Sequence, residues 1–259
     1  MIYKYVFWLA VLSLIVFLLE RIRPWREQSV NRPLLLQDMF WLIFNGYLLG
    51  IIFAPIFKFI DSSMAKGFFT VSGNILKEIR FLSKTGLEIQ IIIILIIGDF
   101  IEWIVHNLLH RVPFLWKLHR IHHSIHTMDW IGNFRFHWTE PLIYHSFRII
   151  PMTILGASWQ AILFVSVFAT LIGFLNHSNL NISWGPLKYI FNSPRMHIWH
   201  HDVKMHKQSG QNFGIVFSLW DWIFRTAYMP DGQPEKLGYY GDEKLSDNLL
   251  KRFFLPFLD

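Results

Sequence analysis

Long apolar runs divide this chain into segments of membrane-spanning length. Residues 5–19 carry no charge, and residues 39–57 form an uncharged run of 19 residues. At about 1.5 Å per residue, a helix of that length crosses the roughly 30 Å hydrocarbon core of a bilayer. A third apolar run begins at residue 89 and should continue as a helix to His110, with its polar residues at the far end. The pattern predicts three membrane helices before residue 111.

A cleaved signal peptide is the alternative for the first run. That run leads directly into the charged residues 20–26 without a small-residue cleavage pattern, which favours an uncleaved helix. The stretch at 58–88 is mixed in character, and we expect a loop with pieces that lie in the membrane interface. Its apolar patch at 67–71 is surrounded by basic residues, namely Lys66, Lys77, Arg80 and Lys84.

Histidines interrupt the apolar pattern in three clusters. His106 and His110 are four residues apart, so they project from one face of a helix. The other two clusters both have i, i+3, i+4 spacing, which also places their imidazoles on one helical face. They are His119, His122 and His123, and then His197, His200 and His201.

The apolar stretch at 141–176 decides the topology. If it crossed the membrane once, the third histidine cluster would lie on the opposite side from the second. The residues Gly156, Ala157 and Ser158 predict a break, with Ser158 as the N-cap of a helix that runs to Leu175. We therefore predict a helical hairpin that enters the membrane and returns His177 to the histidine side. Its non-helical tip needs burial in protein or access to water.

Composition and charge agree with a membrane protein. The chain is 53% hydrophobic with 16% charged residues, whereas soluble domains carry about 25% charge. The net charge of +6 is not concentrated in any Lys/Arg-rich run, so a nucleic-acid partner is not expected. The predicted topology places 17 Lys/Arg on the histidine side and six on the other, which predicts a cytoplasmic histidine face. The expected fold is all-α: about three transmembrane helices, a helical hairpin and a cytoplasmic helical cap that carries the histidine clusters.

Eight clustered histidines indicate more than one metal ion. Imidazole is the commonest protein ligand for transition metals, and the absence of cysteine excludes thiolate ligands. Structural zinc is a poor fit because four ligands complete its site. Iron, zinc, copper and nickel all remain possible by ligand type. Two such ions could activate water for hydrolysis or, as iron, activate O₂. The membrane setting favours oxidation of a lipid C–H bond.

The chain resembles the fatty acid hydroxylase/sterol desaturase superfamily of integral-membrane di-iron oxygenases. The three histidine clusters occur in the family's order between Asp99 and Thr226. Supporting motifs are Phe134-Arg135-Phe136-His137 with Glu140, Asn176-His177-Ser178-Asn179, Asn192-Ser193-Pro194-Arg195, Asn212-Phe213-Gly214 and Trp220-Asp221. The resemblance implies two iron ions, O₂ as co-substrate and a lipid substrate. It also implies an external electron donor, because no flavin, haem or iron–sulfur signature is present.

Residues outside the three clusters complete the expected site. His137 and His177 occupy positions that the resemblance assigns to further ligands. His126 and His145 are weaker candidates, and His206 is expected at the surface. Glu140, Asp202 and Asp221 could hydrogen-bond ligand imidazoles or fix the cap. Asp99 lies deeper in the third apolar run and is the candidate for orienting a ligand histidine.

The expected domain division is 1–88 for the N-terminal helices and loop, 89–230 for the catalytic domain and 231–259 for a C-terminal tail, all within one structural unit. The alternative function is a membrane metal transporter or storage protein, or a relative that has lost catalysis. Transport favours histidines along several spans near the midplane, whereas here they crowd at span ends. The identity of the lipid, and the choice between hydroxylation and desaturation, stay open.

Overall fold

The computed structural model describes residues 2–65 and 80–255. Within these ranges the fold is helical, and its β-structure is limited to isolated bridges. The apolar patch predicted at 67–71, with Lys66 and Lys77, lies outside the described residues. The integral-membrane, all-α prediction is confirmed, because four helical stretches are long and apolar enough to cross a membrane. They are Tyr3–Ile22, Leu35–Ile52, Leu87–Arg111 and Trp159–His177.

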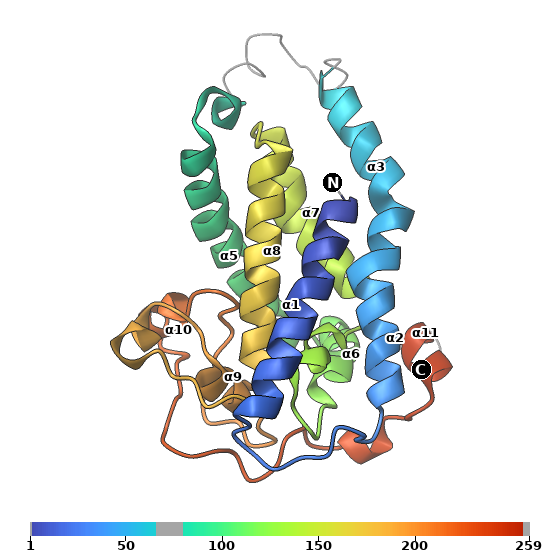
Figure 1. Cartoon of the computed structure of the whole chain (residues 1–259), viewed down its shortest axis with the longest axis vertical. Coiled ribbons are helices and arrows are strands. Elements are labelled where there is room, and N and C mark those ends of the chain that lie inside the picture. Colours follow the sequence, from blue (N-terminus) through green and yellow to red (C-terminus); the bar gives the residue numbers. More distant parts are fainter. Residues whose placement is uncertain (1, 66–79, 256–259) are drawn as a thin grey trace.

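The long helices stand side by side (Figure 1). Helix α1 covers Ile2–Ile22. The second run contains α2 at Leu35–Ile43, a π-helical turn at Phe44–Leu48 and α3 at Leu49–Ala65. The third, α5, runs from Leu87 to Arg111.

The predicted hairpin is present as α7, Thr139–Ile154, and α8, Trp159–His177. Ser158 is the N-cap of α8, since its hydroxyl accepts a hydrogen bond from the Ala161 amide at 3.3 Å. Gly156 adopts a φ of +88°, a conformation that favours glycine. The tip is buried against the short 3₁₀ helix η2, Phe81–Lys84, where the Leu82 amide donates to the Leu155 carbonyl. Contacts within the protein therefore bury the tip and provide hydrogen bonds for its backbone, and α8 returns the chain to the histidine end at His177.

The cap consists of short elements at the histidine end of the bundle (Figure 1). Pro113 begins α6 directly after α5, because proline is tolerated in a first helical turn and not in a helix interior. The cap elements are α6 at Pro113–His123, η3 at Trp130–Phe134, η4 at Gly185–Tyr189, α9 at Pro194–His200, α10 at Leu219–Ile223, η5 at Asp242–Lys244 and α11 at Leu249–Phe254.

The cap is tied to the bundle by buried charges and aromatic rings. Arg135 donates to both oxygens of the Asp38 carboxylate on α2, and Arg32 donates to both oxygens of Asp129. Arg32 also pairs with Asp38 at 2.7 Å. Paired charges of this kind tolerate burial because each supplies the other's hydrogen bonds. Helix α11 packs against α2 as well, where the Phe253 ring stacks on Trp41 at 6.1 Å between centroids.

Candidate metal centre

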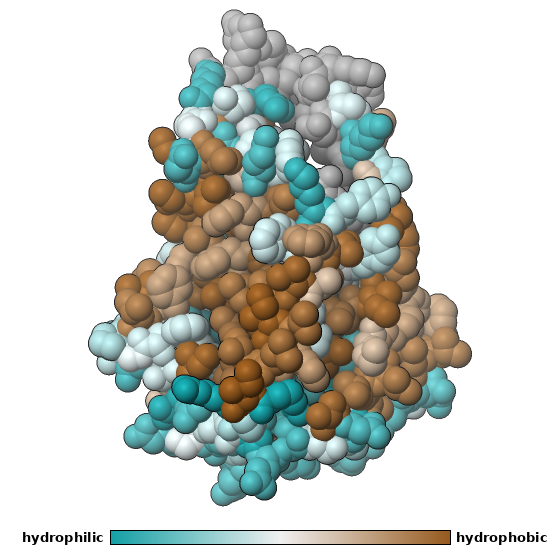
Figure 2. Space-filling view, viewed as in Figure 1, coloured by the Kyte–Doolittle hydropathy of each residue, from teal (hydrophilic) through white to brown (hydrophobic). Residues whose placement is uncertain are grey.

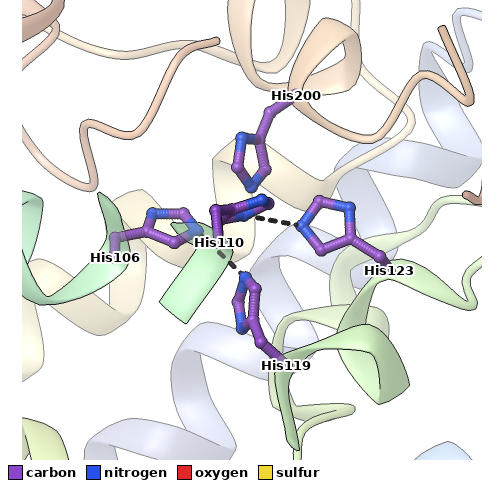
Figure 3. A group of neighbouring side chains, drawn as sticks. All are labelled: His106, His110, His119, His123 and His200. Atoms are coloured by element: carbon purple, nitrogen blue, oxygen red, sulfur yellow. Dashed lines mark hydrogen bonds between the residues drawn. The ribbon is translucent and has the colours of Figure 1, made fainter. Parts of the chain in front are cut away.

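Nine histidines converge into two adjacent groups at the end of the bundle. Each residue offers one ring nitrogen within 4.8 Å of the others in its group. Group 1, drawn in Figure 3, consists of His106, His110, His119, His123 and His200. Group 2 consists of His122, His177, His197 and His201. The structure therefore brings together all eight clustered histidines and the predicted His177.

The two His-His doublets are divided between the groups. His122 belongs to group 2 and His123 to group 1, while His200 belongs to group 1 and His201 to group 2. Neighbouring residues on a helix are rotated by about 100°, so their side chains diverge. The i, i+4 pairs stay together: His119 with His123 in group 1, and His197 with His201 in group 2. Each His-x-x-His-His cluster thus contributes ligand candidates to both groups, although its spacing predicts one shared helical face.

The groups lie against each other. The rings of His123 and His201 stack with centroids 4.6 Å apart and planes at 23°. His200 and His201 have ring centroids 5.2 Å apart. The first contact joins α6 to His201 at the end of α9, and the whole hairpin separates these two segments in sequence. It confirms the prediction that α7 and α8 return the chain to the same side.

In group 1, hydrogen bonds decide which ring nitrogen is protonated. His106 Nδ1 lies 2.8 Å from the Phe213 carbonyl, and His119 Nδ1 lies 2.7 Å from Glu140 Oε2. The Phe213 carbonyl can only accept, so His106 Nδ1 must donate, and the ionised Glu140 carboxylate accepts from His119 Nδ1 in the same way. With these bonds, both neutral rings carry a lone pair on Nε2. The two Nε2 atoms nevertheless face each other at 3.1 Å. Two lone pairs repel at this distance, and a cation bound to both removes the repulsion.

Group 2 has the same arrangement. His122 Nδ1 donates to the Arg135 carbonyl at 3.1 Å, and His177 Nδ1 donates to the Gly173 carbonyl at 2.9 Å. Their Nε2 atoms also lie 3.1 Å apart. Two nitrogens bound to one ion at about 2.1 Å, at an angle of about 90–110°, are about 3.0–3.4 Å apart. The observed spacings fit one ion in each group.

Protonation of the imidazole rings does not explain the short distances between Nε2 atoms in the two groups. Burial, and then the positive charge that neighbouring imidazoles would carry, lower the pKa of His119 and His123 well below the usual value. The pKa values of His122, His197 and His201 are lowered well below the usual value by the same causes. The rings are therefore neutral at physiological pH, which is the form that binds metals.

Several ring nitrogens in the two groups are buried without a hydrogen-bond partner among the described residues. His200 donates through Nδ1 to the Gln211 carbonyl at 2.7 Å, while its Nε2 has no partner. His201 has no partner on either nitrogen, and His197 has none on Nδ1. Buried polar atoms are nearly always paired in native proteins. Orphaned nitrogens gathered at one place fit metal binding by this donor set.

The four candidate carboxylates have different surroundings. Glu140 contacts ligand candidate His119 directly. Asp221 acts through the backbone: it accepts the amides of Phe213 and Gly214 at 2.9 and 2.7 Å and thereby positions the Phe213 carbonyl that holds His106. Gly214 is needed because a Cβ would lie 2.3 Å from the Phe217 carbonyl oxygen.

Asp99 and Asp202 form hydrogen bonds with residues outside the two histidine groups. Asp99 accepts hydrogen bonds from the Val216 and Phe217 amides and from Trp220 Nε1, so it anchors the cap to α5. Asp202 contacts His206 Nε2 at 2.6 Å. Fixing the cap was one of the two roles expected for Asp202. Asp99 was expected to orient a ligand histidine, and it contacts the cap instead.

The structure does not bring His137 into either group. Its Nδ1 lies 2.7 Å from Thr139 Oγ1, and its Nε2 lies 2.9 Å from the Phe253 carbonyl, so it joins the start of α7 to α11. His126 contacts Asp242 at 2.8 Å, and His145 contacts the Pro141 carbonyl. Within residues 2–65 and 80–255, none of these three histidines belongs to a group that could hold a metal ion.

The acceptors that orient the ligand candidates could not be predicted from the sequence. The carbonyls of Gly173, Gln211 and Phe213 leave no trace in residue type, because every residue carries a carbonyl. The Asp38 partner of Arg135 was also missed, since 97 residues separate the two. The one available signal was an isolated acid, Asp38, at the start of an apolar run.

Comparison with known proteins shows which family and which relatives this chain is similar to. The family model described as "Fatty acid hydroxylase" matches residues 91–226, which is more than half of the chain. Ornithine lipid hydroxylase OlsE of Rhizobium tropici is 31% identical over 168 residues, covering 65% of this chain and 50% of that protein. Alkylglycerol monooxygenase of Caenorhabditis elegans is 29% identical over 49% of this chain and 25% of that protein.

Methylsterol monooxygenase 1-1 of Arabidopsis thaliana is 28% identical over 53% of this chain and 46% of that protein. The chain thus spans half or less of the length of these relatives. No solved structure matches it significantly.

Proposed function

The chain belongs to the fatty acid hydroxylase/sterol desaturase superfamily, and from that premise we propose that it is a membrane-bound di-iron oxygenase of lipids. The observation that carries this proposal is the pair of facing, unprotonated Nε2 atoms in each of the two histidine groups. We propose that group 1 holds one iron and group 2 the other. An all-imidazole donor set without thiolate is compatible with iron, and membership of the family favours iron over the other metals that imidazole binds.

A bound iron pair would supply O₂ activation, which hydroxylates a lipid C–H bond or removes two adjacent hydrogens and consumes electrons from a separate donor. The chain's own residues hold and orient that centre. Glu140 and the carbonyls of Phe213, Arg135, Gly173 and Gln211 keep each Nδ1 protonated, so that each Nε2 faces inward. We propose that a separate electron-carrier protein delivers the electrons, because the 259 residues contain no cysteine for an iron–sulfur cluster.

We propose a lipid as the substrate. Three relatives act, by their names, on ornithine lipids, alkylglycerols and methylsterols, which share an apolar body. Histidine groups at the ends of apolar spans would meet such a molecule at the membrane boundary. The excess of Lys/Arg on this side supports a cytoplasmic location for the groups.

His200→Ala tests the proposal, because His200 belongs to group 1 and its Nε2 has no other partner. We expect the wild-type protein to contain about two irons and to consume O₂ when given electrons and membrane lipid. The variant should insert into the membrane, lose iron and lose O₂-dependent lipid oxidation. The matched control is His126→Ala, which removes an imidazole outside both groups and should leave iron and activity unchanged.

A wild-type protein that is loaded with iron and supplied with electrons, yet consumes no O₂ with any lipid extract, would exclude the oxygenase. Iron binding without O₂ consumption would instead favour the transport or storage alternative. Comparison of membrane lipidomes with and without the gene would identify the substrate.

A further inference from the structure

An exposed apolar surface lies on the cap, to one side of the bundle. It is formed by η4, α10 and the residue after each, and we call it the lateral lobe (residues 185–190 and 219–224). Figure 1 shows α10 projecting sideways beside the lower part of α5. Large apolar side chains on the lobe are about half exposed, namely Leu187 at 51%, Tyr189 at 51%, Ile190 at 42%, Ile223 at 56% and Phe224 at 48%. Contiguous exposed apolar surface of this kind marks an interaction site.

The lobe is attached to α5 within its membrane-spanning part. The ring of Phe100 lies 4.8 Å from Trp220 and 5.9 Å from Phe224, and Trp103 stacks on Phe224 at 4.6 Å. Phe100 comes 11 residues before the end of α5, which is about 16 Å along the helix axis. The lobe therefore sits alongside a lipid-exposed helix at membrane depth, whereas most of the cap lies beyond the helix ends.

The two pieces of the lobe form one rigid unit. The Lys188 carbonyl on η4 accepts hydrogen bonds from Ser218 Oγ at 2.6 Å and Trp222 Nε1 at 3.1 Å. The Leu219 amide donates to the Ile190 carbonyl at 3.3 Å. With these backbone groups satisfied by protein, the lobe can enter an apolar medium at little cost in unpaired polar groups.

The exposed charge around the lobe is positive. Residues 185–190 and 219–224 contain two charged side chains, Lys188 and Asp221, and Asp221 is completely buried. The Lys188 ammonium lies 5.3 Å from the centre of the Tyr189 ring, and the exposed Arg225 follows directly. Apolar side chains bordered by cations and aromatic rings are the composition of elements that lie in the headgroup region of a membrane.

We propose that the lateral lobe is inserted into the lipid leaflet on the histidine side, as a second membrane contact besides the spanning helices. Figure 2 shows apolar side chains on this part of the molecule in continuity with the apolar surface of the bundle, with polar side chains below. That continuity, and the absence of exposed carboxylates among residues 185–190 and 219–224, favour lipid over a protein partner. The inference does not depend on the oxygenase activity.

The proposal also links the membrane to group 1. Asp221 lies in α10 and accepts a hydrogen bond from the Phe213 amide. The carbonyl of Phe213 in turn orients His106. The lobe thus contains, on its buried side, one support of the histidine group. A lipid chain beside the lobe would lie close to Asp221, because Asp221 belongs to the lobe.

Site-specific spin labelling tests the insertion, and the cysteine-free chain makes each label unique. Leu187→Cys and Ile223→Cys introduce labels on the lobe. Met205→Cys and Tyr240→Cys are controls, because Met205 and Tyr240 are 68% and 74% exposed on other parts of the cap. Each full-length variant is labelled with a nitroxide and reconstituted in phosphatidylcholine/phosphatidylglycerol vesicles. Collision rates with O₂, which concentrates in lipid, and with a water-soluble nickel chelate are then measured.

We expect the labels at 187 and 223 to collide preferentially with O₂ and those at 205 and 240 with the nickel chelate, with at least a threefold difference in the O₂-to-nickel ratio. Equal nickel accessibility at all four positions would place the lobe in water and overturn the proposal. Labels at 187 and 223 shielded from both reagents would also overturn it, because a second copy of the chain would then cover the lobe.

Discussion

At the scale of single residues, the candidate metal centre depends on which nitrogen of each imidazole carries the proton. His106, His119, His122, His177 and His200 each have Nδ1 next to a fixed acceptor. The acceptor holds the ring by a hydrogen bond and leaves Nε2 unprotonated. A neutral histidine in water exchanges freely between its two tautomers, so these contacts remove an entropic cost before any ion binds.

Glu140→Gln tests this control of the tautomer. The amide has nearly the same size as the carboxylate but no charge, so it holds the His119 Nδ1 proton less strongly. We expect the iron affinity of group 1 to fall about 10–100-fold, as is usual when such a partner is lost. Chelator competition on the purified protein measures this affinity. Glu243→Gln, at an exposed carboxylate, is the matched control, and an unchanged affinity in Glu140→Gln would contradict the assignment.

At the scale of elements, α6 and α9 each serve both groups. Their His-x-x-His-His pattern places an i, i+4 pair in one group and directs the remaining histidine to the other. The two helices use the pattern in opposite senses, since the pair on α6 belongs to group 1 and the pair on α9 to group 2. Two short helices, together with the C-cap residue His201 that follows α9, thereby supply six imidazoles to the two adjacent groups.

Combined substitutions test this division. His122→Ala should remove the ion of group 2 and leave about one iron per chain, because group 1 keeps all its members. Adding His197→Ala should change little, since both residues belong to group 2. Adding His123→Ala instead should also lower the remaining iron, because His123 belongs to group 1. Iron content and thermal unfolding in detergent measure the series, and non-additive losses identify residues that share one site. Equal losses in the two double variants would contradict the division.

At the scale of the whole molecule, buried charged residues connect α2 to the candidate metal centre. Asp38 on α2 holds the Arg135 guanidinium, and the carbonyl of the same Arg135 accepts the His122 proton. Arg32 connects Asp38 to Asp129 in the cap. The N-terminal helices, whose sequence shows only general membrane character, thus take part in orienting a candidate ligand of group 2.

Asp38→Asn should affect group 2 selectively. Leaving a buried guanidinium without its counter-charge costs about 3–5 kcal/mol of stability, and it frees the loop whose carbonyl holds His122. We expect a lower unfolding temperature and loss of about one iron, with group 1 retained. Asp129→Asn is the control, because Asp129 pairs with Arg32 and not with Arg135. Loss of both irons in Asp38→Asn, or equal iron loss in the two variants, would contradict the link.

Local chemistry determined much of this protein from the sequence alone. The apolar runs predicted the spans, Pro113 the break before α6, and Ser158 with Gly156 the hairpin, because each depends on a property of a few neighbouring residues. The histidine spacing predicted which residues gather. A metal site shared by the clusters requires the hairpin, so the expected chemistry predicted the topology.

Only the tertiary structure decided how the histidines are divided and oriented. His122 and His123 are chemically identical in sequence, and their assignment to different groups follows from where α8 and α9 lie. His177 belongs to group 2 whereas His137 contacts α11, although both were predicted from the sequence as further ligands. The acceptors at Phe213, Gln211 and Gly173 are backbone carbonyls, which every residue possesses. Such contacts form only when segments distant in sequence meet in the fold, and therefore no residue pattern predicts them.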